Sequence, residues 1–224
     1  MEKLKKILEV IKKGLKRCAQ PMGITLALIL ICGLIFPLVM TGISQLTMPH
    51  RANGSIIEVN GEKVGSELVG QSFTEDYFVW GRPSAVDYNT YYEDENGNKV
   101  NANGDSFTGP ASGSQNLGPT NEDLENRVKN DLEKFLEKNP GVKKEDIPTD
   151  LLTASGSGLD PHISVKSAMI QLPRVSKASG IAIEELEAIV KENTAGKFLG
   201  IFGEEHVSVL GVNLDIAKRM GKIS

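Results

Sequence analysis

Residues 22–47 read MGITLALILICGLIFPLVMTGISQLT and carry no charged side chain. The nearest charges are Arg17 before this stretch and Arg51 after it. As a helix it would be about 39 Å long at ~1.5 Å per residue, and a bilayer core needs only about 20 apolar residues. It exceeds the ~7–15-residue apolar core of a cleaved signal peptide, and no A-x-A cleavage pattern follows it. The stretch therefore predicts an uncleaved membrane-spanning helix.

The residues before this stretch are strongly basic. Residues 1–21 hold seven basic and two acidic side chains, net +5, and basic flanks stay on the cytoplasmic side of a membrane. We therefore expect a cytoplasmic arm at 1–21, a span at 22–47 and an extracytoplasmic domain at 48–224. Apolar residues also recur in the arm at helical spacing: Leu4, Ile7, Leu8, Ile11 and Leu15. This spacing predicts an amphipathic helix on the inner membrane face. The alternative is a helix continuous with the span.

Two features of the span concern its packing and shape. Gly23 and Ala27 are small residues four positions apart, and this spacing lets another membrane helix approach closely. Pro37 lacks a backbone N–H, so we expect a kink where the helix continues through it. The span thus predicts a helix-packing face at Gly23 and Ala27.

The remainder of the chain is acidic. The whole sequence has 25 basic and 29 acidic residues, so residues beyond the arm have 18 and 27, net −9. This balance argues against a nucleic-acid-binding surface. Both cysteines, Cys18 and Cys32, precede residue 48, so the outer domain can form neither a disulfide nor a cysteine-based zinc site. It is long enough for one hydrophobic core without such links.

Residues 48–224 predict one compact α+β domain. Apolar residues at 56–64 flank Asn60-Gly61, a pair that accepts the positive φ angles of a type I′ hairpin turn. Residues 120–139 predict the clearest helix, with Thr120 and Asp123 spaced as in a capping box. The other expected elements are a strand at 77–80, a helix that contains Pro173, a helix at 184–192, a strand at 207–210, and a strand or helix at 212–220.

Residues 81–119 are rich in Gly, Asn, Ser and Asp and lack apolar periodicity, which predicts one long loop. Long loops in compact domains are usually functional or mobile. Tyr88, Tyr91 and Tyr92 either form a recognition face or anchor the loop to its own domain. Residues 93–98 lack the spacing of a calcium-binding EF-hand loop, so we expect a solvated turn there.

Short motifs follow one another from the end of the span almost to the C-terminus. They are Gly70-Gln71-Ser72-Phe73, Gly81-Arg82-Pro83-Ser84, Ala111-Ser112-Gly113-Ser114-Gln115-Asn116-Leu117-Gly118-Pro119, Gly156 to Ser164, Pro173-Arg174-Val175, Phe198-Leu199-Gly200, Val209-Leu210 and Asn213-Leu214. In their order and spacing, these motifs resemble the C subunit of the Kdp-type potassium-transporting P-type ATPase of bacteria.

The resemblance implies a supporting role in a bacterial cell-membrane complex. The family works with a channel-like potassium-translocating subunit, a P-type ATP-hydrolysing subunit and a small single-span subunit, and ATP hydrolysis drives potassium uptake. The C subunit is described as assembling the complex and as a catalytic chaperone that raises the ATP affinity of the hydrolysing subunit. The resemblance therefore implies a subunit that is not catalytic alone and that leaves ATP and potassium to the complex.

The residues favour assembly over direct contact with ATP. The sequence has neither the D-K-T-G-T motif that P-type ATPases phosphorylate nor a G-x-x-x-x-G-K-[ST] loop. Gly156-Ser157-Gly158, ahead of a helix start, is the best candidate for a phosphate cradle. The same stretch also predicts a structural turn, in which Asp160 precedes Pro161, His162 is a hydrogen-bonded partner and Ser164 caps a helix. We expect the turn, because the predicted outer location separates it from cellular ATP.

A membrane-anchored extracytoplasmic hydrolase or metal-binding domain is the alternative. Ser157 or Ser164 could act as a nucleophile with His162 as base and Asp160 as orienting carboxylate, but a single short loop rarely allows that geometry. A metal site from Asp160, His162 and His206 would require a fold that brings them together. We expect neither a resident cofactor nor a metal.

Overall fold

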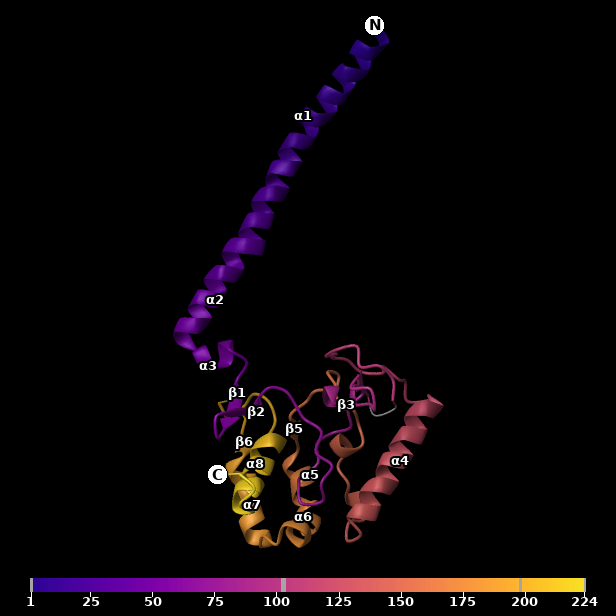
Figure 1. Cartoon of the computed structure of the whole chain (residues 1–224), viewed down its shortest axis with the longest axis vertical. Helices are drawn as coiled ribbons and strands as arrows, with labels where there is room; N and C mark the ends of the chain where they lie inside the picture. Colours follow the sequence, from indigo (N-terminus) through magenta and orange to yellow (C-terminus); the bar gives the residue numbers. More distant parts are fainter. Residues whose placement is uncertain (1, 102–103, 198, 224) are drawn as a thin grey trace. The chain divides into compact units, whose positions relative to one another are not determined.

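The computed structural model describes residues 2–101, 104–197 and 199–223, apart from the side chains of residues 2, 4, 6–8, 10, 11 and 15. The chain forms two compact units, Met1–Ser55 and Ile56–Ser224. The first unit is helical, and the second combines helices with short strands (Figure 1). This mixture of helix and sheet agrees with the expected α+β class.

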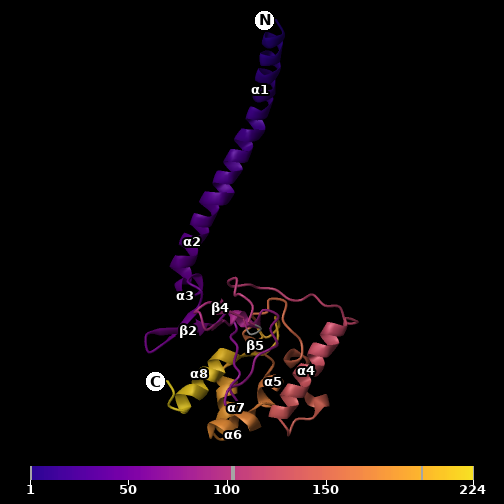
Figure 2. The same ribbon diagram turned by 45° about the vertical axis from the view of Figure 1, so that its right-hand side comes forward.

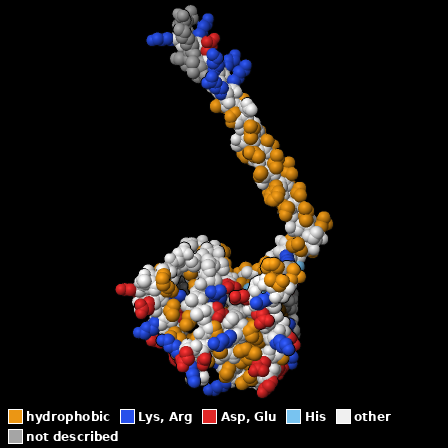
Figure 3. Space-filling model, turned by 180° about the vertical axis from the view of Figure 1, so that it is seen from behind, with side chains coloured by type: hydrophobic (Ala, Val, Ile, Leu, Met, Phe, Trp, Pro, Cys, Tyr) orange, Lys and Arg blue, Asp and Glu red, His pale blue; other side chains and the backbone are white. Residues whose placement is uncertain are grey.

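The first unit is a long helix followed by a short one. α1 (Glu2–Leu30), the π-helical turn η1 (Ile31–Ile35) and α2 (Phe36–Thr47) follow one another directly, and α3 (Pro49–Ala52) comes after Met48. The part Lys12–Thr47 is long and apolar enough to cross a membrane. Apolar side chains cover the middle of this helix, and Lys and Arg side chains gather toward its N-terminal end (Figure 3).

The arm does not form a helix of its own, because α1 runs without a break from Glu2 through residue 21 into the span. The apolar face expected on the arm lies outside the described residues, since it rests on the side chains of Leu4, Ile7, Leu8, Ile11 and Leu15.

The helix also continues past Pro37, in the first turn of α2, after the π-helical turn η1. In η1 the Phe36 N–H donates to the Ile31 carbonyl, five residues back. Proline removes a backbone donor, and a π-turn is one way for a helix to accommodate that loss.

The second unit contains three small antiparallel sheets among its described residues. β1 (Ile56–Val59) pairs with β2 (Glu62–Ser66), β3 (Tyr92–Glu93) pairs with β4 (Lys99–Val100), and the third sheet has the order β5 (His162–Ile163), β7 (His206–Ser208), β6 (Thr194–Ala195). The helices are α4 (Glu122–Lys138), α5 (Val165–Met169), α6 (Leu172–Ser179), α7 (Ile183–Glu192) and α8 (Val209–Arg219), with the 3₁₀ turns η2 (Asp87–Asn89), η3 (Lys144–Asp146) and η4 (Thr149–Leu151).

The hairpin predicted around Asn60-Gly61 is confirmed. Both residues have positive φ, 55° and 81°, as a type I′ turn requires. Val59 pairs with Glu62 across this two-residue turn, and a β-bulge lies further along, between Ile57 and Glu58. The local turn chemistry was therefore sufficient to predict this element.

Two groups of buried apolar side chains form the core of the second unit. The larger lies among α5–α8, β5 and β7, where α6, α7 and α8 stand side by side in both ribbon views (Figure 2). Its most deeply buried members are Val79, Ala168, Leu172, Val175, Leu186, Val190, Val207, Val212 and Ile216. The smaller group joins one face of α4 to the segment after it, through Leu132, Phe135, Ile147 and Leu151. Each Val, Leu, Ile or Phe side chain among them stabilises the fold by roughly 1.5–3 kcal/mol when fully buried.

The strand predicted at 77–80 is wrong, although its residues belong to the core. This segment is irregular, and two side-chain amides satisfy its backbone. Val79 donates its N–H to Asn213 Oδ1 at 2.8 Å and accepts from Asn213 Nδ2 at 2.9 Å. Gln171 binds the N–H and the carbonyl of Trp80 at 2.9 and 3.1 Å. These amides take the place of a neighbouring strand.

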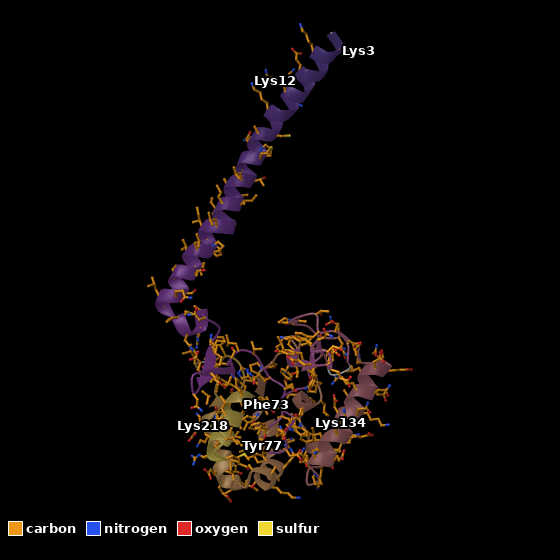
Figure 4. All side chains as sticks on the ribbon, in the orientation of Figure 1. Lys3, Lys12, Phe73, Tyr77, Lys134 and Lys218 are labelled. Carbon is orange, nitrogen blue, oxygen red and sulfur yellow. The ribbon has the colours of Figure 1, made fainter. Side chains whose placement is uncertain are left out.

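Aromatic packing secures the same segment. Phe73 and Tyr77, both labelled in Figure 4, pack edge-to-face with Phe78 at ring-centroid distances of 5.4 and 4.6 Å. The Lys222 ammonium lies 4.2 Å from the centre of the Tyr77 ring. The aromatic residues that suggested a strand therefore hold an irregular segment against the core.

The start of α4 differs from the prediction. Asn121, not Thr120, is the N-cap, because its side-chain oxygen accepts the Asp123 N–H at 2.8 Å. The predicted capping box is therefore wrong by one residue. The end lies one residue before the predicted 139, since α4 stops at Lys138, ahead of Pro140-Gly141.

Pro173 and Val209-Leu210 also lie in different elements from those predicted. Pro173 is in the first turn of α6, where a missing N–H removes no helical bond. The helix expected to contain it is instead two helices, α5 and α6. Ser208 accepts the Gly211 N–H as the N-cap of α8, so Val209-Leu210 begin a helix rather than end a strand.

The described part of 81–119 is mostly irregular, and residues 102 and 103 lie outside the description. It nevertheless contains η2 and the β3–β4 hairpin. The turn of that hairpin is held by Asp94, which accepts from the N–H groups of Asn96 and Asn98 at 2.8 Å each. The expected turn at 93–98 is thus present as the end of a hairpin.

Candidate functional site

The motif segments that lie far apart in the sequence meet around the turn at 156–164. The Ser84 hydroxyl donates to the Gly158 carbonyl at 2.6 Å, and the Gly113 N–H donates to the Ser157 carbonyl at 2.8 Å. Gly70 donates its N–H to the Leu159 carbonyl at 2.8 Å. We call this set of contacts, formed by residues 70, 82–88, 112–113 and 157–160, the loop junction.

An ion pair closes the loop junction. Arg82 Nη1 lies 2.8 Å from Asp160 Oδ2, and both side chains are about three-quarters buried, with 23% and 25% exposed. The second carboxylate oxygen of Asp160 accepts the His162 N–H at 3.0 Å. Arg82 also donates to the Thr153 carbonyl from Nε and Nη2. Asp160 therefore fixes both the turn that follows it and the arginine that reaches it.

Tyr88 anchors the start of the long loop in the junction. Its hydroxyl donates to the Arg82 carbonyl at 2.8 Å, and burial, with Asp160 nearby, raises the pKa of Tyr88 to about 12. Asp87, Tyr88 and Asn89 have φ angles of 46°, 51° and 58°, a left-handed run that costs free energy in each residue. The Ser84 hydroxyl oxygen stabilises this run by accepting the Tyr88 N–H at 2.9 Å.

The three tyrosines of the loop do not act together. Tyr88 takes the anchoring role, whereas Tyr91 and Tyr92 are 45% and 53% exposed. Tyr91 packs on Phe107 at a ring-centroid distance of 5.3 Å, and the Lys99 ammonium lies 4.0 Å from the centre of its ring. These contacts lie within the long loop.

The two glycines of Gly156-Ser157-Gly158 have different environments. Gly158 is buried with φ +68°, and a Cβ there would lie 2.8 Å from the Gly113 carbonyl oxygen and 2.8 Å from a Val86 methyl carbon. A Cβ on Gly156 would meet nothing within 4 Å. The close backbone approach at Gly158 is therefore made by the chain itself.

The start of α5 is capped as predicted, and an additional residue takes part. Ser164 Oγ accepts the Ser167 N–H at 3.1 Å. The Asp150 carboxylate accepts the Ser164 N–H at 2.7 Å and the Ser167 hydroxyl at 2.7 Å. A carboxylate of the chain thus lies at the helix terminus where a phosphate would bind. No sequence signal identified Asp150, which is 14 residues from Ser164.

Two histidines lie beside the junction. The rings of His162 and His206 pack edge-to-face with centroids 4.3 Å apart, and His162 Nδ1 lies 3.7 Å from Asp160 Oδ1. Burial is the larger cause that lowers the pKa of His162, and the neighbouring His206 lowers it further. Asp160 acts in the opposite direction and raises this pKa. They line a groove of about 790 Å³ whose charged lining includes Arg82, Asp150, Asp160, Lys166, Glu204 and Glu205.

The geometry does not assemble the alternative hydrolase. Ser157 Oγ accepts the Leu159 N–H and lies 3.4 Å from Ser155 Oγ. Ser164 Oγ contacts Asp150 and Ser167 instead of the His162 ring. Nor, in the described ranges of the chain, does any group of three or more His, Cys, Asp and Glu side chains have the geometry to hold a metal ion.

The motif Pro173-Arg174-Val175 provides a second buried polar centre. The Arg174 guanidinium donates to the carbonyls of Asp76 and Phe78 at 2.6 and 3.0 Å, and to Asn139 and Gln171 side chains at 3.1 and 2.8 Å. It also lies over the Trp80 ring at 4.1 Å. Burial lowers the pKa of Arg174 to about 10, so it stays charged near neutral pH. This arginine joins α6 to the irregular segment before Trp80.

The proposed packing residues of the span are on α1. Gly23 and Ala27 are exposed within this chain, and a Cβ on Gly23 would meet nothing within 4 Å. Leu26 and Leu30, nearby on the same helix, are 60% and 47% exposed. The face therefore offers both small residues and apolar surface to another helix.

Comparisons with known proteins cover almost the whole chain. The family described as "KdpC: K+-transporting ATPase, c chain" matches residues 18–218. The chain is 54% identical over 209 residues to the potassium-transporting ATPase KdpC subunit of Clostridium kluyveri, covering 93% of this chain and 95% of the relative. The corresponding subunit of Clostridioides difficile is 54% identical, with 89% and 96% covered. That of Caldanaerobacter subterraneus is 43% identical, with 88% and 93% covered.

These matches bear out the resemblance carried by the motifs. They extend over both the apolar helix and the unit that contains the loop junction. The chain therefore belongs to the KdpC family, the c chain of the bacterial K+-transporting ATPase.

Proposed function

We propose that this chain is an accessory subunit that assembles and stabilises the ATP-driven potassium-uptake complex and is not catalytic alone. The observation that carries this proposal is the loop junction, where the motif segments satisfy one another's polar groups. Buried polar groups in folded proteins are nearly always hydrogen-bonded, and the motif residues here find these partners within the chain. The motifs thus support a scaffold.

Its partners are the channel-like potassium-translocating subunit, the P-type ATP-hydrolysing subunit, the small single-span subunit and the lipid membrane. A nucleic-acid partner is not proposed, because residues beyond the arm have net charge −9. Potassium and ATP are handled by the complex as a whole. Gly23 and Ala27 form the proposed packing face toward another membrane helix.

The proposed topology has residues 1–21 in the cytoplasm, 22–47 in the bilayer and 48–224 outside. The basic N-terminal part of α1 and the uncharged span support it. It is tested by adding protease to intact spheroplasts. Digestion beyond residue 50 agrees with this orientation, whereas protection of that part, while a known outer protein is cut, overturns it.

The turn at 156–164 is proposed as a structural element rather than a nucleotide site. Three observations support this: Gly158 packs against the chain itself, Asp160 pairs with Arg82, and Asp150 lies at the start of α5. The catalytic-chaperone role implied by the resemblance would then act through the assembled complex, by holding the hydrolysing subunit in its competent arrangement.

Co-purification tests the assembly role directly. The potassium-translocating and ATP-hydrolysing subunits are expressed with and without this chain and isolated in mild detergent through a tag on the translocating subunit. We expect the hydrolysing subunit to be recovered in stable association only when the chain is present. Equal recovery without the chain contradicts the proposal.

A further inference from the structure

The most exposed large apolar side chains of the second unit, among its described residues, belong to one short connection between β6 and β7. Ile201 is 75% exposed, Leu199 74% and Phe202 62%. We call Leu199–Phe202 the apolar tip; Phe198, which precedes it, lies outside the described residues. Clustered apolar exposure of this kind marks an interaction surface.

The apolar tip is attached to a firmly held base. β7 is the central strand of its sheet, and Val207 in it is fully buried. β6 pairs with it through Thr194–Val207 and Ala195–His206. The Asn193 side chain donates to Asp215 on α8 at 2.8 Å, and the Ser208 N–H donates to the Asn193 carbonyl at 3.0 Å. The tip therefore projects from the core sheet.

The loop junction and the apolar tip are linked through the sheet. The turn that contains Asp160 leads into β5, and β5 pairs with β7 through His162–Ser208 and Ile163–Val207. The edge-to-face contact of His162 with His206 lies at this pairing. The loop junction therefore fixes β5, and β5 in turn holds β7, the strand that follows the apolar tip. The proposed scaffold thus positions the tip.

The charges beside the tip decide between possible occupants. Glu204 and Glu205 follow it and are exposed, with Lys197 on the preceding side. Lipid surfaces attract basic flanks and repel acidic ones when the lipids are anionic. A symmetric contact between two copies would bring the same glutamates together. The acidic border instead complements a basic rim on a different protein.

We propose that the apolar tip docks into an apolar pocket with a basic rim on another subunit of the potassium-transporting ATPase. This inference rests on the proposed assembly role, since it names the element through which the domain binds another subunit of the complex. A few anchoring side chains that fill pockets near the centre of an interface contribute most of its binding free energy. Leu199 has a left-handed φ of 52° in the free chain, and strained backbone of this kind clusters at functional sites.

Photo-crosslinking in the full-length chain tests the occupant. Ile201 is replaced by photoreactive p-benzoylphenylalanine, the chain is expressed with the other subunits, and membranes are irradiated. Replacement of Ile183 by p-benzoylphenylalanine serves as the control, because Ile183 lies on α7 and is 40% exposed. We expect position 201 to give an adduct with another ATPase subunit in higher yield than position 183. Adducts with lipid alone, or with a second copy alone, overturn the inference.

A paired substitution provides the energetic test. The double variant Leu199→Ser, Ile201→Ser should lower recovery of the intact complex about tenfold, as for loss of interface anchors. Leu68→Ser, at a side chain 60% exposed elsewhere in the unit, should leave recovery unchanged. Unchanged recovery for the double variant overturns the docking role. If the wild-type chain itself fails to co-purify, the assembly proposal fails instead, so the two failures are distinct.

Discussion

Gly156 and Gly158 stand two residues apart in one turn, yet the structure demands glycine only at the second. Gly158→Ala should lower the free energy of unfolding by roughly 1–3 kcal/mol through its positive φ alone, with the 2.8 Å approach to Gly113 adding to it. Gly156→Ala should stay within about 0.5 kcal/mol of the wild type. Denaturant unfolding of the full-length chain in detergent measures both variants.

This glycine pair also discriminates between a turn and a phosphate cradle. In a cradle, both backbones approach the ligand, so both variants should lose ligand-dependent stabilisation while unfolding nearly alike without ligand. Similar unfolding of Gly156→Ala and Gly158→Ala would therefore contradict the close packing described at Gly158.

His162 should make stability depend on pH. Burial and the adjacent His206 hold its pKa below the ordinary 6.5, while Asp160 opposes them. The unfolded chain then takes up the proton more readily, so the stability from His162 is present above pH 6.5 and is lost as the pH falls toward the folded pKa. As the pH is lowered from about 7 to 5, the melting temperature should fall less steeply for His162→Asn than for the wild type.

A His162→Asn variant with the same acid slope as the wild type would show that other groups cause the pH dependence. Arg82, Lys166, Asp150, Glu204 and Glu205 line the same groove as His162.

At the scale of elements, Arg174 holds α6 against an irregular segment. Arg174→Met leaves the Asp76 and Phe78 carbonyls without a donor and removes the contact with Trp80, so we expect a loss of on the order of 3 kcal/mol. Arg174→Lys should recover only part of the lost stability, because an ammonium group lacks the planar, forked set of donors of a guanidinium. Lys177→Met, at an exposed position on α6, should be nearly neutral in the same denaturant titration. Equal effects at 174 and 177 would contradict this role.

Elements with local causes could be predicted from the sequence. Asn60-Gly61 was sufficient for the hairpin because the turn geometry depends on those two residues. The helix expected at 120–139 and the Ser164 cap could likewise be predicted, since helix formation and capping act over a few residues.

Elements with distant causes could not be predicted. The segment at 77–80 has strand-forming residues, but its backbone partners are Gln171 and Asn213, 91 and 134 residues away. Asp150 in the cap of α5 escaped notice for the same reason. The candidate turn at 156–164 was found from its motif, whereas its partners Arg82, Ser84 and Gly113 emerged only from the fold.

At the scale of the molecule, the span has to bring this chain to its partners. Gly23→Leu and Ala27→Leu should each weaken co-purification with the channel-like subunit, because added bulk keeps a neighbouring helix away. Gly42→Leu tests whether bulk anywhere in the span has that effect, and its recovery should match the wild type. Full recovery of the complex with both Gly23→Leu and Ala27→Leu would remove this face from the assembly.

The central claim is that the motif turn supports assembly and does not itself hold ATP. The most direct test is the apparent ATP affinity of ATP hydrolysis in fully assembled complexes that carry Asp160→Ala or Ser164→Ala, with subunit content verified for each preparation. We predict a lower melting temperature for both variants: Ser164→Ala loses a helix cap, equivalent to about 0.5–2 kcal/mol, and Asp160→Ala loses the partner of Arg82 and of the His162 N–H. The ATP affinity should be unchanged in the complexes that remain intact. A several-fold weaker ATP affinity in intact complexes, with the melting temperature unchanged, would contradict the account.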